Sequence, residues 1–327
     1  MKIYDDQLIV VTGGAGFIGS GVIHHLNDKG LRNIVVVDDL GTSDKWKNLV
    51  GKQFIDIISK HHLFEWLKGK EHLIDAFIHL GACSSTVEKD ANYLLENNYR
   101  FTVHLAEYAI KNNHRFIYAS SAATYGDGSD GFQDSHNELQ KLAPLNMYGY
   151  SKHLFDLWAS QQEILDKIVG LKYFNVFGPN EWHKGRMASA IMHVVPMALK
   201  EGKIRLFKSN DPHFSNGGQQ RDFIYVKDVA RMTCSFLDND VTGIFNIGTG
   251  IAETWNDLAK AIFKALNLPE NIEYIDMPPD LLGKYQNYTC ADMSRTWGVL
   301  GDLAKCTPLE ESVKDYVQNY LLPEKRW

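Results

Sequence analysis

The chain of 327 residues lacks the features that mark several protein classes. It has four cysteines (Cys83, Cys234, Cys290 and Cys306) and no C-x-x-C pair, which excludes a zinc ribbon and a dithiol motif. Its 13 histidines form no H-E-x-x-H sequence. No apolar run approaches the roughly 20 residues of a membrane-spanning helix, and the N-terminal sequence M-K-I-Y-D-D-Q-L does not resemble a signal peptide. These absences predict a cytoplasmic protein with reduced thiols, no metal site and no membrane segment.

An excess of basic residues is also lacking. The chain has 34 Lys and Arg against 40 Asp and Glu, a net charge of -6. Binding to nucleic acid depends on clustered Lys and Arg that displace counterions, so this composition argues against a nucleic-acid partner. An anionic small molecule would need a local basic cluster. The apolar content of 44% is typical of a globular protein, and the length allows one large domain or two ordinary domains.

The first forty residues follow the order strand, glycine turn, helix, strand. Leu8–Val11 is a β-branched apolar run, as expected of a strand covered on both faces, and Ile34–Val37 is a second such run. Between them, Gly13, Gly16 and Gly19 stand three residues apart at the start of a helix-like segment. In a dinucleotide-binding unit the first glycine permits a tight turn, the second lets backbone approach a pyrophosphate, and the third lets the helix pack closely. The pattern therefore predicts a nucleotide site.

The residues that follow the second strand leave the cofactor type open. Asp38 and Asp39 end this strand, and an acid there usually binds the adenosine ribose hydroxyls and favours NAD. Lys45 and Lys60 could instead bind a 2′-phosphate, which would favour NADP.

Strands and helices alternate along the rest of the chain. We predict strands at Phe54–Ile58, Asp75–Leu80, Arg115–Ala119, Ile168–Asn175, Asp222–Val226, Ile244–Ile247 and Ile272–Ile275. Helices are expected at Asp90–Asn112, Met147–Asp166, Ala188–Glu201 (kinked by Pro196), Trp255–Leu266 and Leu309–Leu321, with a polar loop over Phe207–Gln220. This alternation predicts an α/β fold, a Rossmann-type doubly wound parallel sheet with a smaller α/β substrate-binding lobe. The cofactor domain would comprise residues 1–175 and 222–248, and the substrate domain residues 176–221 and 249–327.

Proton-transfer residues follow the fifth predicted strand. Tyr148 and Lys152 are four apart at a helix start and so project from one face. A tyrosine alone has a pKa near 10, but an ammonium group one turn away stabilises its phenolate. Ser121, or Thr124 as second choice, could donate a hydrogen bond to a substrate oxygen. Together these residues are typical of a hydride-transfer site, in which the tyrosine moves the proton.

Several motifs carry a family resemblance. T-G-G-A-G-F-I-G, S-S-A-A-T-Y-G and Y-G-Y-S-K resemble the extended short-chain dehydrogenase/reductases. The segments H-L-G-A-C-S-S-T, K-Y-F-N-V-F-G-P-N-E-W-H-K-G-R-M-A-S, Q-R-D-F-I-Y-V-K-D-V, F-N-I-G-T-G and G-K-Y-Q resemble the ADP-L-glycero-D-manno-heptose 6-epimerase family. The resemblance covers nearly the whole chain.

The resemblance implies an isomerase of lipopolysaccharide core heptose biosynthesis. Such enzymes invert C6 of the heptose in ADP-D-glycero-D-manno-heptose by transient oxidation and hydride return with tightly bound NADP, and they are commonly pentameric. The alternatives are another nucleotide-sugar 4-epimerase or a dehydratase of the same fold, or a non-catalytic NADP-binding protein. A dehydratase normally has Thr-Asp-Glu in the serine stretch, whereas this chain has S-A-A-T-Y-G.

The resemblance also implies site residues. The catalytic residues would be Tyr148, Lys152, Lys184 and Ser121. The cofactor contacts would be Gly13, Gly16, Phe17, Ile18, Gly19, Asp38, Asp39, Lys45, Lys60, Leu80, Gly81, Ala82, Cys83, Ser84, Asn97, Lys152, Val176 and Lys184. The substrate contacts would be Ser121, Asn175, Arg186, His193, Phe207, Lys208, Ser209, Asn210, Arg221 and Tyr285. Lys184, in H-K-G, is either a second acid/base or a pyrophosphate or surface contact, and Arg186 stands where the family usually has serine.

Overall fold

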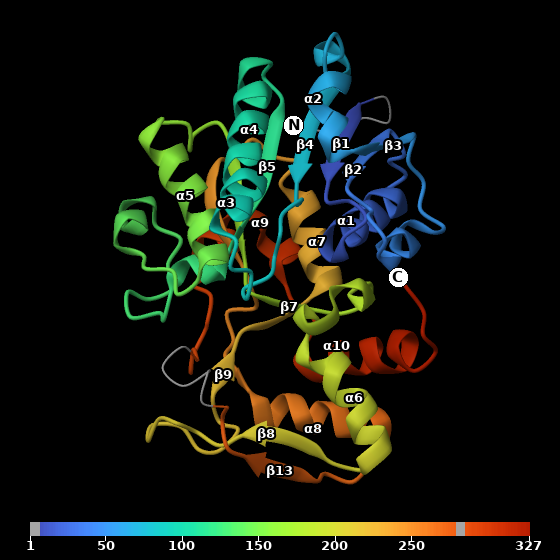
Figure 1. The fold of residues 1–327 in the computed structure, drawn as a ribbon, viewed down its shortest axis with the longest axis vertical. Helices are drawn as coiled ribbons and strands as arrows, with labels where there is room; N and C mark the ends of the chain where they lie inside the picture. The colour runs from blue at the N-terminus through green and yellow to red at the C-terminus, as the bar shows by residue number, and fades with distance from the viewer. Residues whose placement is uncertain (1–6, 279–284) are drawn as a thin grey trace.

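The computed structural model describes residues 7–278 and 285–327, and its largest element is a seven-stranded parallel sheet (Figure 1). The strands are β1 (Leu8–Thr12), β2 (Ile34–Asp38), β3 (Asp56–Ser59), β4 (Ile74–His79), β5 (Arg115–Ser121), β6 (Val169–Tyr173) and β11 (Gly243–Ile247). Their spatial order is β11-β6-β5-β4-β1-β2-β3. The order reverses between β1 and β4, and ligands of such sheets bind in the crevice beyond the carboxyl ends of the strands at this point. The predicted Rossmann-type fold is confirmed.

Helices cover both faces of the sheet. Side chains alternate between these faces along each strand, so successive residues of one strand are buried in different cores. On β1, Ile9 and Val11 share a core with α1 (Phe17–Asp28), α7 (Val226–Ser235) and α9 (Ser294–Leu300), whereas Val10 shares a core with α2 (Leu63–Trp66), α4 (Phe101–Lys111) and α5 (Met147–Gln161). The apolar run read from the sequence is therefore buried on both sides.

A second, smaller group of elements lies below the sheet in Figure 1. It contains α6 (Ala190–Glu201), α8 (Trp255–Leu266), α10 (Leu309–Tyr316) and the parallel pair β8 (Ile204–Phe207) and β13 (Ile272–Ile275). Two further pairs connect it to the sheet: β7 (Asn175–Phe177) with β10 (Phe223–Tyr225), and β9 (Gln220–Arg221) with β12 (Glu253–Thr254). Phe177 and Tyr225 pack in the core of this group. The domain boundaries stay a prediction.

Several elements differ from the sequence-based expectations. The strand expected at Ile168–Asn175 divides at Phe174 into β6 and β7, which join different sheets. The helix from Met147 ends at Gln161, and the helix expected at Asp90–Asn112 consists of α3 (Ala91–Leu94), a π-helix (Leu95–Arg100) and α4. Strand β8 and helix α9 were not expected.

Part of the sequence reading falls on residues that the structure does not describe. Residues 1–6 of the predicted cofactor domain, and Gly283 and Lys284 of G-K-Y-Q, lie outside the described ranges. Within 7–278 and 285–327, no helix has the length and apolar character needed to cross a membrane.

Candidate active site

A glycine-rich turn joins β1 to α1 and requires glycine at two positions. Gly13 has a φ of +67°, and a Cβ there would lie 2.7 Å from the backbone of Gly81. A Cβ on Gly19 would lie 2.1 Å from the carbonyl oxygen of Gly13, so glycine lets α1 start directly against the turn. The N–H of Ala15 donates to Asp38 Oδ2 at 2.9 Å, which ties the turn to the end of β2. The turn thus presents backbone and a helix N-terminus, an arrangement that suits a pyrophosphate.

A cavity of about 590 Å³ opens at the strand-order reversal, beside this turn. Among the residues predicted from the sequence, it is lined by Gly13, Gly16, Phe17, Ile18, Gly19, Asp38, Lys45, Leu80, Gly81, Ala82, Cys83, Ser84, Ser121, Tyr148, Lys152, Asn175, Val176 and Lys184. It is also lined by Ser85, Thr86, Ala119, Ser120, Tyr173, Phe174, His183 and Met187, which were not predicted. The glycine turn and the proposed proton-transfer residues therefore share one cavity.

A smaller cavity of about 200 Å³ lies at the ends of β1 and β2. It is lined by Asp39, Lys60 and Asn97, together with Asp38 and Lys45. Lys45 Nζ lies 2.6 Å from Asp38 Oδ1, and Lys60 Nζ donates to Asn97 Oδ1 at 2.7 Å. Asp38 thus already accepts hydrogen bonds from Lys45 and from the glycine turn, and two ammonium groups border this cavity.

Helix α5 holds Tyr148 and Lys152 against the loop that follows β5. Asn146 caps the helix, since its Oδ1 accepts from the N–H of Gly149 at 2.8 Å. A Cβ on Gly149 would lie 2.7 Å from the carbonyl oxygen of Ala123, so glycine permits the close approach of α5 to this loop. Tyr148 is brought to the serine at the end of β5 by this contact.

The environment of these side chains changes their acidity. Burial raises the pKa of Tyr148, and a hydrogen bond with the Ser121 side chain opposes this rise. Burial lowers the pKa of Lys152 to about 8, and the carboxylate of Asp156 opposes this fall. Thr124, the second choice for a substrate hydrogen bond, is fully buried and donates to the carbonyl oxygen of Ser121 at 2.8 Å, so its hydroxyl faces the protein.

Lys184 reaches the large cavity from the short helix Trp182–Met187. Its ammonium lies 4.9 Å from the centre of the Phe17 ring, at the start of α1. Burial lowers the pKa of Lys184, and Glu181 opposes this fall. Glu181 is fixed, because it accepts from Ser189 Oγ at 2.6 Å and from Tyr316 OH at 2.8 Å.

A side-chain bridge connects the glycine turn to residues at the far end of the sequence. Asn48 Nδ2 donates to the carbonyl oxygens of Ala15 at 3.1 Å and Asn180 at 3.0 Å. Arg326 Nε donates to Asn48 Oδ1 at 3.2 Å. The N–H of Trp327 donates to Asn180 Oδ1 at 2.9 Å. We call this group the Asn48 bridge.

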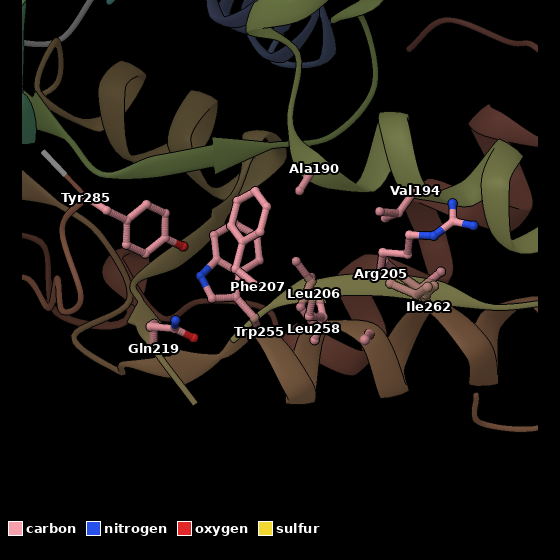
Figure 2. Close-up of a pocket in the computed structure, with 12 residues that line it drawn as sticks. Ala190, Val194, Arg205, Leu206, Phe207, Gln219, Trp255, Leu258, Ile262 and Tyr285 are labelled. Carbon is pink, nitrogen blue, oxygen red and sulfur yellow. The ribbon is translucent and has the colours of Figure 1, made fainter. Parts of the chain in front are cut away.

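An apolar pocket of about 230 Å³ lies between α6, β8 and α8 (Figure 2). In Figure 2, Tyr285, Gln219, Trp255 and Phe207 surround one end of it. Arg221 stands next to this pocket, with its guanidinium carbon 4.9 Å from the centre of the Tyr285 ring and 6.0 Å from that of Trp255. Flat apolar surfaces beside a guanidinium suit an aromatic base followed by a phosphate.

Comparison with known proteins gives the family. A model of the NAD dependent epimerase/dehydratase family matches residues 9–248. The chain belongs to this family. A curated epimerase/dehydratase relative from Nitratidesulfovibrio vulgaris (strain Hildenborough), named ADP-L-glycero-D-manno-heptose-6-epimerase, is 50% identical over 317 residues, 96% of this chain and 98% of the relative. A Fusobacterium nucleatum relative of the same name is 48% identical over 329 residues, 97% of this chain and 99% of the relative. The resemblance read from the motifs is confirmed.

Solved structures of this epimerase family show the same fold. The ADP-L-glycero-D-manno-heptose-6-epimerase of Helicobacter pylori is 28% identical, with a TM-score of 0.80 and coverage of 96% of both chains. A UDP-N-acetylglucosamine 4-epimerase of Methanobrevibacter ruminantium is 26% identical, with a TM-score of 0.79, covering 99% of this chain and all of the other. Within the epimerase/dehydratase family, the fold alone therefore does not show which sugar nucleotide a member acts on.

Six of the substrate contacts expected for the epimerase line none of the three cavities described above. These are Arg186, His193, Lys208, Ser209, Asn210 and Arg221, of which Arg221 stands beside the apolar pocket. Arg186, His193 and Asn210 are exposed. Lys208 Nζ pairs with Asp276 at 2.9 Å, and Ser209 Oγ donates to the carbonyl oxygen of Asp211 at 2.7 Å.

Other lining residues of the epimerase were missed by sequence reasoning. Ser85 and Thr86 complete G-A-C-S-S-T, so the motif itself was a usable signal. His183 stands next to Lys184 in the short helix Trp182–Met187. Gln219 and Trp255 come from segments far apart in sequence that meet where β9 pairs with β12, and no local pattern marks them.

Proposed function

We propose that the chain is an ADP-glyceromanno-heptose 6-epimerase, an isomerase that converts ADP-D-glycero-D-manno-heptose to ADP-L-glycero-D-manno-heptose. The observation that carries this proposal is the identity of 48–50% with curated relatives of that name over nearly their whole length. The substrate is thus an ADP-heptose, and we assign the reaction to lipopolysaccharide core biosynthesis in the cytoplasm, by a homo-oligomer with five subunits as the first candidate.

The residues around the large cavity fit a dinucleotide cofactor. Gly13 and Gly19 are positions that a Cβ would block, which leaves the backbone of the turn open to a pyrophosphate. Lys45 and Lys60 border the small cavity, where a 2′-phosphate would find two cations. We therefore propose NADP, with NAD as the alternative that Asp38 would favour. When bound, the nicotinamide supplies a hydride acceptor and donor.

The side chains of the cavity would then handle the proton. C6 of the heptose is not next to a carbonyl, so its hydrogen is not acidic and the carbon must become planar to lose its configuration. Tyr148 would take the hydroxyl proton at C6 and return it, while Ser121 holds the oxygen and the charge of Lys152 favours the tyrosinate. Return of hydride to the opposite face requires either that the carbonyl group turns, in which case Tyr148 returns the proton, or a second acid/base, a role that Lys184, on another wall of the same cavity, can fill.

The apolar pocket would hold the ADP group. Phe207 and Tyr285 offer faces to the adenine, and Arg221 is suited to its pyrophosphate. Asn175, which lines the large cavity, would contact the sugar. The remaining proposed substrate contacts are Arg186, His193, Lys208, Ser209 and Asn210, and they would need the bound ligand to bring them together. We also propose that residues 1–175 and 222–248 bind the cofactor and that residues 176–221 and 249–327 bind the substrate.

The test is an NMR measurement of C6 configuration. Purified protein with no added nicotinamide receives ADP-D-glycero-D-manno-heptose in deuterated water, and the cofactor is extracted and identified by mass. We expect inversion without deuterium at C6, and NADP in the extract. Deuterium at C6 would overturn hydride return, and NAD in the extract would overturn the cofactor assignment. No inversion, even with NADP and NAD supplied, would overturn the proposed activity and direct the search to UDP-sugar 4-epimerisation.

A further inference from the structure

A buried ion pair lies directly behind the wall of the large cavity. Asp156 on α5 and Lys172 on β6 are both fully buried, and Lys172 Nζ lies 3.1 Å from Asp156 Oδ2. The transfer of two charges from water to a protein interior costs more than their attraction usually returns, so such a pair is poorly explained by stability alone. Its contacts lead to the residues that we assign to proton transfer.

The carboxylate of Asp156 connects α5 to β5. Tyr118 OH donates to Oδ1 at 2.8 Å, and Ser120 Oγ donates to Oδ2 at 2.8 Å. Ser120 itself lines the large cavity and precedes Ser121. Asp156 therefore fixes the end of the strand that carries the proposed substrate hydrogen-bond donor.

The ammonium of Lys172 fixes the loop after β5. Its Nζ donates to Thr124 Oγ1 at 2.5 Å, and the Thr124 hydroxyl in turn donates to the carbonyl oxygen of Ser121 at 2.8 Å. The ammonium also lies 4.7 Å from the centre of the Tyr125 ring. A chain of direct contacts thus runs from the ion pair to Ser121.

Asp156 also lies one helical turn after Lys152 on α5. The other titratable groups around Lys152 are Cys83 in the loop after β4, His79 at the end of β4, and Tyr148 on its own helix. Burial, with Lys152 as a further cause, lowers the pKa of His79 to about 3, so this imidazole is neutral. Asp156 is thus the carboxylate one turn from Lys152 on α5, and its negative charge opposes the fall that burial causes in the pKa of Lys152.

We propose that Asp156 and Lys172 are a positioning pair for the reaction: Lys172 holds Ser121 in place through Thr124, and Asp156 keeps Lys152 in its ammonium form. The proposal rests on the proposed function for the roles of Ser121 and Lys152. The competing explanation is that the pair only fastens α5 to the sheet.

Asp156→Asn separates the two explanations, because it removes the charge and keeps one oxygen as acceptor for one of the two hydroxyls, Tyr118 or Ser120, while its amide NH2 can donate to the other. The matched control is Asp228→Asn, since Asp228 is also a buried carboxylate, paired with Arg231 at 2.5 Å on α7. We expect Asp156→Asn to move the alkaline fall of kcat to lower pH by about one pH unit or more, with unchanged KM and cofactor content. Asp228→Asn should lower Tm without moving the pH profile. If Asp156→Asn lowers only Tm, the positioning role is overturned.

Two further measurements keep the test independent of folding and of the substrate. Titration of Lys152 by NMR of ε-carbon-labelled lysine, assigned with Lys152→Arg, needs no turnover, and its midpoint should fall in Asp156→Asn even if the wild type does not epimerise ADP-heptose. An unchanged midpoint contradicts the inference, whereas an inactive wild type contradicts only the proposed function. If Asp156→Asn does not fold, Thr124→Val tests whether Lys172 holds Ser121 in place through Thr124. We expect the kcat of Thr124→Val to fall about tenfold with KM unchanged. A kcat equal to that of the wild type would overturn this role of Lys172.

Discussion

The hydroxyl of Tyr148 is the atom on which the proposed proton transfer depends. Tyr148→Phe removes it and leaves the glycine turn unchanged, so we expect C6 inversion to fall by at least about a hundredfold while bound cofactor remains. NMR of the product and the absorbance of extracted cofactor measure the two quantities. Turnover close to that of the wild type would exclude Tyr148 as the acid/base.

Two roles are open to Lys184 at the large cavity, that of a second acid/base and that of a binding contact. If it is the second acid/base, Lys184→Met should lower kcat more than it raises KM, because a proton is then missing in the transition state. Lys184→Arg is the matched control, since it keeps the positive charge but not an ammonium of low pKa. A raised KM with unchanged kcat in Lys184→Met would reduce Lys184 to a binding contact.

Burial of the Lys152 ammonium lowers the free energy of unfolding, and the pH dependence of this effect can be predicted. Burial lowers the pKa of Lys152 from 10.5 to about 8, so between these values the unfolded chain binds more protons than the folded protein. The cost is complete below about pH 8 and disappears above 10.5, and it amounts to about 3 kcal/mol. We therefore expect Lys152→Met to be more stable than the wild type in urea at pH 7, with the difference vanishing near pH 10.5. Equal stability at pH 7 would contradict this.

At the scale of elements, α1 can start where it does only because Gly19 has no side chain. Gly19→Ala would place a Cβ 2.1 Å from the Gly13 carbonyl oxygen, so we expect the turn to be displaced and cofactor binding to be lost. Gly298→Ala in α9 is the control, because its Cβ would meet nothing within 4 Å, and alanine should stabilise that helix by about 1 kcal/mol. Calorimetry and cofactor content test both variants. Cofactor retained in Gly19→Ala would contradict the close approach.

The central strands were predictable because each is buried on both faces and reads as an apolar run. Val35 and Val36 are neighbours on β2 and belong to different cores, yet both positions are apolar, which is the signature of a covered parallel strand. The break at Phe174 was not predictable, since apolar residues stand on both sides of it, Tyr173 before and Val176 and Phe177 after, while the chain leaves one sheet for another. The end of α5 at Gln161 was missed because no glycine or proline marks it.

Residues of the candidate site could be predicted from the sequence where they stand at the end of a strand or at a fixed spacing along a helix. The Gly13 turn, Ser121 and the Tyr148–Lys152 pair are of this kind, and all of them line one cavity. Trp255 was missed because it reaches its pocket from a different part of the chain, through tertiary packing.

Across the whole molecule, the Asn48 bridge joins three distant segments. Arg326→Ala removes the donor to Asn48 Oδ1 and, by loosening Asn48, weakens the link between the glycine turn and the loop of Lys184. We expect faster loss of cofactor on dialysis, by about threefold or more for a lost hydrogen bond of roughly 1 kcal/mol, with an unchanged urea midpoint for the sheet. Lys325→Ala, next to it in sequence, is the control. Cofactor loss at the wild-type rate would show that the bridge does not support the site.

The Asn48 bridge has a consequence for the folding of the chain during its synthesis on the ribosome. Ala15 is made more than 300 residues before Arg326, yet its carbonyl oxygen is held by Asn48, which Arg326 contacts in the folded protein. The central sheet closes earlier, once β11 has been made at residue 247. A nascent chain can therefore assemble its sheet during translation while the frame of its glycine turn is still incomplete. Firm capture of the dinucleotide therefore requires that residues 326 and 327 have been made and have left the ribosome.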